Sequence, residues 1–166
     1  MGRKKNMPLI AAVIICVLSI IVMVAALAFS GSNPEKAVFV PPQFDENAVR
    51  GTPNVPEGLG WSELDAQVYK VSVCGVVILK DGKADVWFTN SEKNAVWLKL
   101  RVLDADGNIL GETGLIRPGE YVEFVDFTAI PEEDDPVSLK IMAYEAETYY
   151  SAGSVTLNTT ITGGNK

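Results

Sequence analysis

The stretch VWLKLRVL, residues 96–103, decides the fold class of this chain. Every second residue from position 96 to 102 is aliphatic, and Trp97, Lys99 and Arg101 occupy the positions between them. Successive side chains of a β-strand point to opposite faces of its sheet, so this period of two is typical of a strand with one buried face. We therefore expect an aliphatic face in the core and Trp97, Lys99 and Arg101 on the surface.

Further runs of the same kind surround this strand, and turn signals separate them. Asp81-Gly82 and Asp106-Gly107 are hairpin signals, because glycine tolerates the positive φ of the second turn position. No amphipathic helical pattern lies between the runs, so the sequence predicts an all-β sandwich of about seven antiparallel strands. Cys74-Gly75 inside one run predicts a bulge or a change of sheet. The six further runs cover residues 68–79, 84–89, 108–115, 121–127, 137–144 and 154–161.

Four segments together resemble the immunoglobulin-like domains of Gram-positive bacterial surface and membrane proteins, a largely uncharacterised group. They are ADVWFTN at 84–90, the strand at 96–103, DGN at 106–108 and GLIRPGE at 114–120. The resemblance covers about residues 67–162 and implies an immunoglobulin-like β-sandwich. Its motifs are strand and turn signals, which indicate the architecture and are weak evidence for any activity. The Cys…Trp…Cys arrangement of antibody-type domains is missing.

The N-terminal segment 8–29 contains no charged residue and follows a basic tip that contains Arg3, Lys4 and Lys5. A helix of 22 residues rises roughly 33 Å, enough to cross a hydrocarbon core of about 30 Å. Basic flanks face the cytoplasm. We expect a single-pass plasma-membrane protein with a cytoplasmic tip at 1–7, a transmembrane helix at 8–29 and an extracellular C-terminal domain.

A cleaved signal peptide is the alternative, since Ala26-Leu27-Ala28 has the form of a cleavage site. The apolar run is longer than the usual core of a signal peptide, which favours a retained anchor; whether cleavage occurs at Ala28 stays open. A lipoprotein is excluded because Cys16 lies in the middle of the run, after Ile15.

The remaining chain divides into a tether, a domain and a tail. Five of the nine prolines fall in residues 31–66, which favours a semi-rigid extracellular linker. The sandwich is expected at 67–162 and a flexible tail at 163–166. Trp61 is expected to dock on the domain, with a short helical turn at 61–64.

The charge and the cysteine and histidine content exclude several functions. Beyond residue 30 the chain carries 21 acidic against 11 basic residues, a net charge of −10, which opposes binding of nucleic acid or anionic lipid headgroups. Cys16 and Cys74 lie in separate regions and cannot pair. Without histidine, Cys74 has no evident base. We predict a non-enzyme with no cofactor and no small-molecule substrate; a hydrolase using two carboxylates is the weakest hypothesis.

Two acidic segments are compared with calcium sites. DADGN at 104–108 has its glycine at position 4 rather than 6 of a calcium loop, and Leu115 stands where the loop needs glutamate, which favours a plain hairpin. PEEDDP at 131–136 is interpreted as a solvated loop, and weak calcium binding there stays open. No metal site is predicted.

A partner-binding surface is the remaining hypothesis. Trp97, Lys99 and Arg101 share the exposed face of one strand, and Tyr149 and Tyr150 lie in the last hairpin. Trp87, flanked by Val86 and Phe88, is expected in the core. The sequence thus favours a membrane-anchored domain for protein–protein interaction or envelope assembly at the cell surface, with an unidentified protein partner. The alternative is a carbohydrate- or cell-wall-binding module that uses these aromatic residues.

Overall fold

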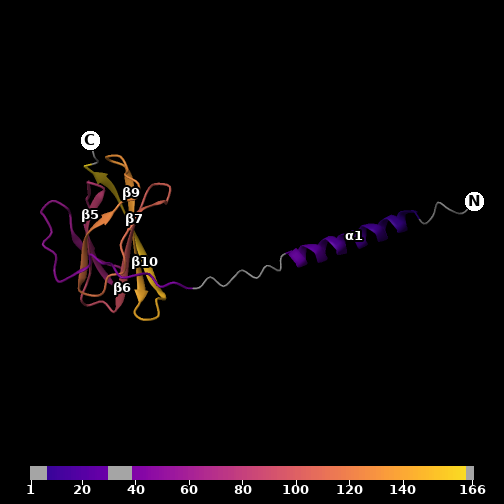
Figure 1. Ribbon diagram of the computed structural model, residues 1–166, viewed down its shortest axis with the longest axis horizontal. Coiled ribbons are helices and arrows are strands. Elements are labelled where there is room, and N and C mark those ends of the chain that lie inside the picture. The colour runs from indigo at the N-terminus through magenta and orange to yellow at the C-terminus, as the bar shows by residue number, and fades with distance from the viewer. Residues whose placement is uncertain (1–6, 30–38, 164–166) are drawn as a thin grey trace, which may run out of the picture. The chain divides into compact units, whose positions relative to one another are not determined.

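The structure, a computed structural model, describes residues 7–29 and 39–163, which belong to two units. The first unit contains the helix α1 (Met7–Phe29), and the second, from Pro41 onward, is all β (Figure 1). The expected basic tip, apart from Met7, lies outside the described residues. So do residues 31–38 of the expected linker and residues 164–166 of the expected tail.

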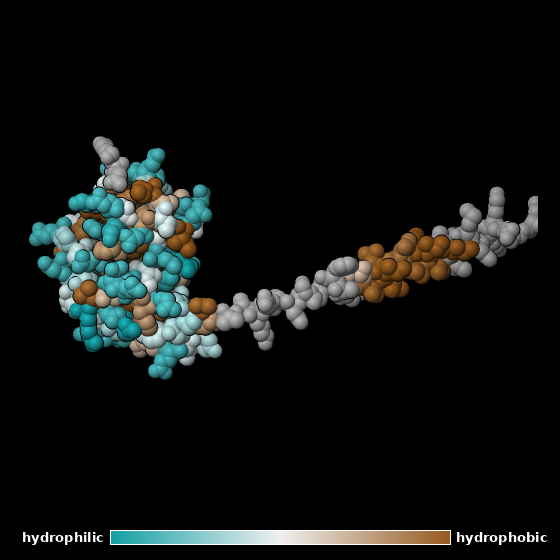
Figure 2. Space-filling view, viewed as in Figure 1, coloured by the Kyte–Doolittle hydropathy of each residue, from teal (hydrophilic) through white to brown (hydrophobic). Residues whose placement is uncertain are grey.

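Helix α1 has no acidic residue in its first turn and no basic residue in its last. Its side chains are described at Ile10 and at 12–25; all of these are exposed, and none is charged (Figure 2). Over the residues that the structure describes, no helix meets the length and apolarity required of a membrane span.

The second unit is one curled sheet of ten strands. Eight of them are joined in the order β1-β8-β5-β4-β10-β9-β6-β7; in addition, β3 pairs with β5, and β2 pairs with β3. All strand pairs are antiparallel except that of β10 with β4. The strands are β1 (Val49–Arg50), β2 (Ser62–Asp65), β3 (Lys70–Val73), β4 (Val77–Lys80), β5 (Lys83–Asn90), β6 (Val96–Leu103), β7 (Ile109–Glu112), β8 (Glu120–Asp126), β9 (Pro136–Glu145) and β10 (Ser151–Thr162).

Strand β10 joins the two halves of this sheet. Residues 151–160 pair with β9, whereas Ile161 and Thr162 pair with β4. The buried faces of both halves contribute to one core, which includes Phe88 of β5, Leu100 of β6 and Ile141 of β9, all fully buried. The all-β prediction is confirmed, with ten strands in place of the seven expected.

The expected strand 68–79 is interrupted where the sequence carries Cys74-Gly75. Strands β3 and β4 both pair with β5, so the chain leaves the ladder briefly and returns to the same neighbour. In the gap the Cys74 N–H donates to the Val86 carbonyl at 2.9 Å, and the Gly75 N–H donates to the Gly60 carbonyl at 3.3 Å. The sequence thus located the irregularity, which is an interruption within one half of the sheet.

The expected linker is partly wrong, because its described part from Pro41 belongs to the folded unit. Strand β1 pairs with β8, and β2 pairs with β3. Trp61 docks as expected, its Nε1 donating to the Trp87 carbonyl at 2.9 Å, but it precedes a strand and not a helical turn. These strands are too short to show a period of two, and they are stabilised by neighbours distant in the sequence.

Burial controls the chemistry of Cys74, whose side chain is fully buried. Burial, together with the nearby charge of Asp85, raises the pKa of the Cys74 thiol to about 12. Since only the thiolate is nucleophilic, a Cys16→Ser variant should resist iodoacetamide at pH 8 when folded and react fully in denaturant. Mass spectrometry of the alkylated protein tests this; rapid labelling of the folded protein would contradict it.

Candidate functional site

Trp97 of β6 lies at the centre of an aromatic cluster. Its ring meets Phe44 edge to face at 4.9 Å and Tyr149 at 5.1 Å. The Arg117 guanidinium lies 3.6 Å from the centroid of the Phe44 ring, on the side available to a cation–π contact. Trp97 is half-buried, and its contacts hold the segment around Phe44 against β6. This tryptophan is therefore first of all a structural residue.

Lys99 and Arg101, expected on the exposed face of β6, both bind one carboxylate on the neighbouring strand β7. Lys99 Nζ lies 2.7 Å from Glu112 Oε1, and Arg101 Nε lies 2.7 Å from Glu112 Oε2. The register places Arg101 directly opposite Glu112. Lys99 is only 9% exposed, so the expectation of a surface lysine at this position is wrong. Glu112 thus pairs with both cations across the strands, and its single negative charge offsets one of their two positive charges.

This cluster predicts a pH-dependent contribution to stability. Burial alone raises the Glu112 pKa, but the hydrogen bonds from Lys99 and Arg101 outweigh it, so the pKa is lowered overall. The pKa of Glu112 is therefore lower in the folded protein than in the unfolded chain, where it is near 4.5, and the ionised carboxylate stabilises the fold above that pH. This stabilisation is lost as the pH falls through the folded-state pKa. Because Glu112 is partly solvent-exposed, we expect Glu112→Gln to cost about 1 kcal/mol at pH 7.

Urea unfolding of the two proteins at pH 7 and pH 3 measures this contribution. The difference in unfolding free energy between wild type and Glu112→Gln should be smaller at pH 3 than at pH 7. Glu123→Gln on β8 is the control, since Glu123 forms no ion pair within the described residues. An equal Glu112→Gln effect at both pH values would contradict the prediction.

The two tyrosines of the last hairpin differ in environment. Tyr149 packs against Trp97, and its N–H donates to the Glu145 carbonyl at 3.1 Å. Tyr150 is 71% exposed. Of the five residues expected to form a binding surface, the structure thus brings Trp97 and Tyr149 into contact and joins Lys99 with Arg101 through Glu112. Only Tyr150 is largely exposed.

A second region of the sheet forms a cleft of about 290 Å³. The register aligns Glu63 of β2 with Ser72 of β3, and Ser72 with Thr89 of β5, so three polar side chains form a row across three strands. Trp61 lies at the side of this row. The cleft is lined by Arg50, Gly51, Thr52, Pro53, Trp61, Glu63, Ser72, Thr89, Asn90, Ser91, Glu92 and Gly119.

The cleft contains polar groups that the fold leaves available. Ser72 is 7% exposed, and its hydroxyl forms no hydrogen bond with the described residues. Arg50 is exposed and forms no ion pair within the described ranges, whereas Glu63 pairs with Lys70 at 2.9 Å. A hydroxyl without a partner and an unpaired guanidinium, which line one cleft together with an indole, are groups that orient a polar ligand.

Trp87 lies next to this region and not in the core, contrary to expectation. It sits at the β5 bulge between Asp85 and Phe88, with φ of 45°. Its ring stacks on Tyr121 of β8 at 6.3 Å. Its Nε1 is buried and has no hydrogen-bond partner among the described residues. Residues 84, 86, 88 and 90 of β5 are buried in regular alternation, so Trp87 lies on the opposite face of the strand.

The two acidic segments meet at another cleft, of about 240 Å³, lined by Asp104, Asp106 and Asp135 among others. Hydrogen bonds from the Asn108 side chain and backbone lower the Asp104 pKa. The Asp104 carboxylate thus stabilises the turn between β6 and β7, as the hairpin interpretation requires. Within the described residues, no group of three or more acidic, cysteine or histidine side chains is placed to hold a metal ion.

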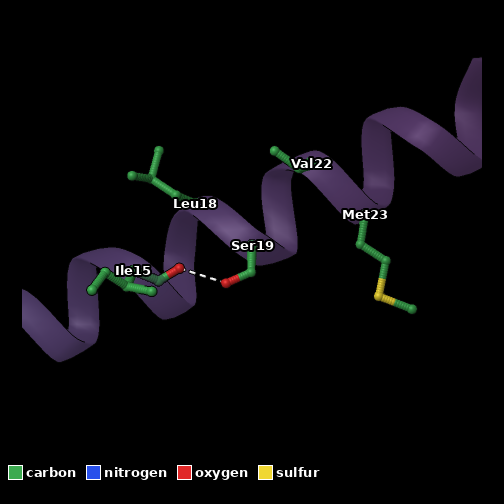
Figure 3. A pocket seen from close by; sticks show the side chains of 5 residues that line it. All are labelled: Ile15, Leu18, Ser19, Val22 and Met23. Atoms are coloured by element: carbon green, nitrogen blue, oxygen red, sulfur yellow. Dashed lines mark hydrogen bonds between the residues drawn. The ribbon is translucent and has the colours of Figure 1, made fainter.

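Helix α1 carries only a shallow apolar hollow, formed by residues 15, 18, 19, 22 and 23 (Figure 3). Its one polar member, Ser19, donates its hydroxyl to the Ile15 carbonyl one turn earlier. The hydroxyl is thereby satisfied within the helix, which leaves the surrounding surface apolar.

Sequence reasoning missed the cleft because its residues come from separate segments. Arg50, Ser72 and Thr89 meet only through the register of the sheet, and nothing in their local sequence marks them. The docking of Trp61 was the one available signal. No protein-family model matches this chain, and comparisons with curated proteins and with solved structures find no match either.

Proposed function

We propose that this chain is a single-pass membrane protein that displays a binding domain outside the cell. This proposal rests mainly on the uncharged segment 8–29, which follows a cluster of basic residues. The internal hydrogen bond of Ser19 supports it, because a bilayer offers no partner for a free hydroxyl. The tip would lie in the cytoplasm and the β unit outside the plasma membrane.

Cell fractionation and protease shaving test this topology. The full-length protein should sediment with membranes and resist extraction by carbonate. Protease added to intact cells should release peptides from residues 41–163 and none from the first 29 residues. Recovery of the full-length protein in the soluble cytosol would contradict the proposal.

We also propose that the curled sheet is an immunoglobulin-like sandwich. Its support is the single core shared by two sheet halves and the passage of β10 from one half to the other. Ten strands and a parallel β10–β4 pair depart from the simplest seven-strand arrangement. Such a fold favours a scaffold for recognition, but fold alone assigns no activity.

The binding function is a contact with a protein partner or envelope component at the cell surface. The cleft between β2, β3 and β5 favours a second candidate, recognition of a carbohydrate. Sugar rings stack on indoles and bind hydroxyl, carboxylate and guanidinium groups, and the cleft offers Trp61, Ser72 and Arg50 for these contacts.

Two arginine variants compare the cleft with the face of β6. Retention of the detergent-solubilised full chain on immobilised peptidoglycan should fall at least fivefold in Arg50→Ala. Arg101→Ala, which removes the same charge from the other half, should leave retention unchanged. No retention of the wild type, or loss in Arg101→Ala alone, would contradict recognition through the cleft.

A further inference from the structure

The first part of β10 is an open sheet edge without the protection that the other edges have. Within the described part of the chain, residues 151–160 pair with β9 alone, and strand β4 takes up the opposite side only at Ile161. An open edge exposes backbone N–H and C=O groups that can pair with another chain. Proteins normally block such edges by short strands, charged residues or proline.

The other edges of this sheet are blocked in these ways. Strand β1 has two residues, one of them Arg50, and β2 has four, including Glu63 and Asp65. Strand β7 has four residues, and its Leu110 carbonyl accepts hydrogen bonds from both the N–H and the hydroxyl of Thr128. Strand β10 has twelve residues with no charge and no proline, in a domain of strongly acidic composition.

The side chains along this edge are also incompletely covered. Val155 and Leu157 pack against the core but remain partly exposed, since no strand of the described residues covers the side away from β9. Ser154, Thr156 and Asn158 are exposed on the opposite face. Asn158 accepts a hydrogen bond from Ser138 through Oδ1, and its Nδ2 forms none with the described residues.

We propose that β10 pairs antiparallel with β10 of a second copy of this chain, in a register centred on Thr156. This register places Val155 opposite Leu157 of the second copy and Ser154 opposite Asn158. Apolar residues thus meet apolar ones, and a hydroxyl meets the amide Nδ2 that the fold leaves free. A second copy fits because the edge carries no charge, so two acidic domains meet here without like charges in contact.

The pairing is short, and the structure explains where it ends. The bulge between Ser151 and Gly153 bends β10 at one end. At the other end the Thr159 hydroxyl donates to the Gly75 carbonyl at 2.7 Å, and β4 follows. About five residues of each copy are left to pair, so we infer a weak dimer.

Cysteine cross-linking of the full chain tests the pairing, in a Cys16→Ser background and with the buried Cys74 left in place. Thr156→Cys places two thiols on the symmetry axis, within reach of a disulfide. Mild oxidation in membranes and in detergent should give at least tenfold more covalent dimer than Ser138→Cys, which lies one strand further from the axis. Equal yields at the two positions would overturn the proposal.

A charge exchange tests the register itself. In the Thr156→Cys chain, Ser154→Lys with Asn158→Lys sets lysine opposite lysine at both ends, and cross-linking should fall at least fivefold. Ser154→Lys with Asn158→Glu sets lysine opposite glutamate and should restore it. Circular dichroism and melting temperature confirm that both variants fold.

Equal cross-linking of these two variants would overturn the register. A covalent adduct with a different protein in place of the dimer would overturn the proposal that a second copy of this chain pairs with the β10 edge. Cross-linking in detergent tests the β10 pairing independently of the proposed membrane anchor, because this pairing does not require α1 to lie in a bilayer.

Discussion

Replacing Leu18 and Val22 of α1 with arginine is expected to prevent membrane insertion of the full-length protein. Each arginine near the centre of a membrane helix costs about 2.5–3.5 kcal/mol for insertion, so the pair costs roughly 5–7 kcal/mol. Figure 3 shows both side chains on α1, next to the internally bonded Ser19. Ultracentrifugation should find the double variant mainly in the soluble fraction, and protease added to intact cells should no longer reach its β unit.

The matched control is Leu18→Ala with Val22→Ala, which shortens the same side chains without adding charge. This protein should remain in the membrane fraction and stay accessible to external protease. The proposed anchor would be wrong if the double arginine variant sedimented and was cleaved like the wild type.

Gly114→Ala is expected to release the segment around Phe44 and to destabilise the β unit by about 2–4 kcal/mol. A Cβ at position 114 would lie 2.6 Å from the Asp45 Cα and 2.7 Å from the Phe44 carbonyl carbon, so backbone would have to move. The same movement would disturb the bond from the Gly114 N–H to Asp45 Oδ2, now 2.7 Å. It would also separate Phe44 from Trp97.

Thermal unfolding followed by tryptophan fluorescence measures this effect, and a loss on the order of 10 °C is expected for a domain of this size. Gly75→Ala is the control: its Cβ would lie 3.4 Å from the Gly60 carbonyl oxygen, and its φ is not positive. That variant should melt within about 2 °C of the wild type. If both variants melt alike, the close packing at Gly114 is not what holds the segment.

This packing changes how a Trp97 variant is interpreted. An exposed tryptophan on a strand suggests a binding residue, and Trp97→Ala then seems a direct test of ligand binding. In the structure Trp97 contacts both Phe44 and Tyr149, so its loss would destabilise the unit as well. Arg50 and Arg101 give a cleaner comparison, because neither side chain belongs to the core: Arg50 is exposed and Arg101 is half-buried.

The cleft and the open edge are separate features. The cleft is lined by residues of β1, β2, β3 and β5 and of the loops beside them, whereas the edge lies at β10 in the other half of the sheet. Loss of ligand retention in Arg50→Ala should therefore leave cross-linking through Thr156→Cys unchanged. This independence allows the two proposals to fail separately.

The sequence by itself determined the features that depend on local pattern. The period of two in residues 96–103 gave a strand with Leu98 and Leu100 fully buried, and Asp106-Gly107 gave a turn. The uncharged run at 8–29 gave a helix. These features follow from neighbouring residues, because side-chain alternation and turn geometry are set within a few positions of the chain.

Only the tertiary structure decided which distant residues meet. Pairing of β1 with β8 drew the expected linker into the fold, and Glu112 reached Lys99 from the next strand. Trp87 of β5 stacks on Tyr121 of the neighbouring strand β8. Each outcome depends on strand register, which is set by the packing of the whole sheet and by strand neighbours far away in the sequence.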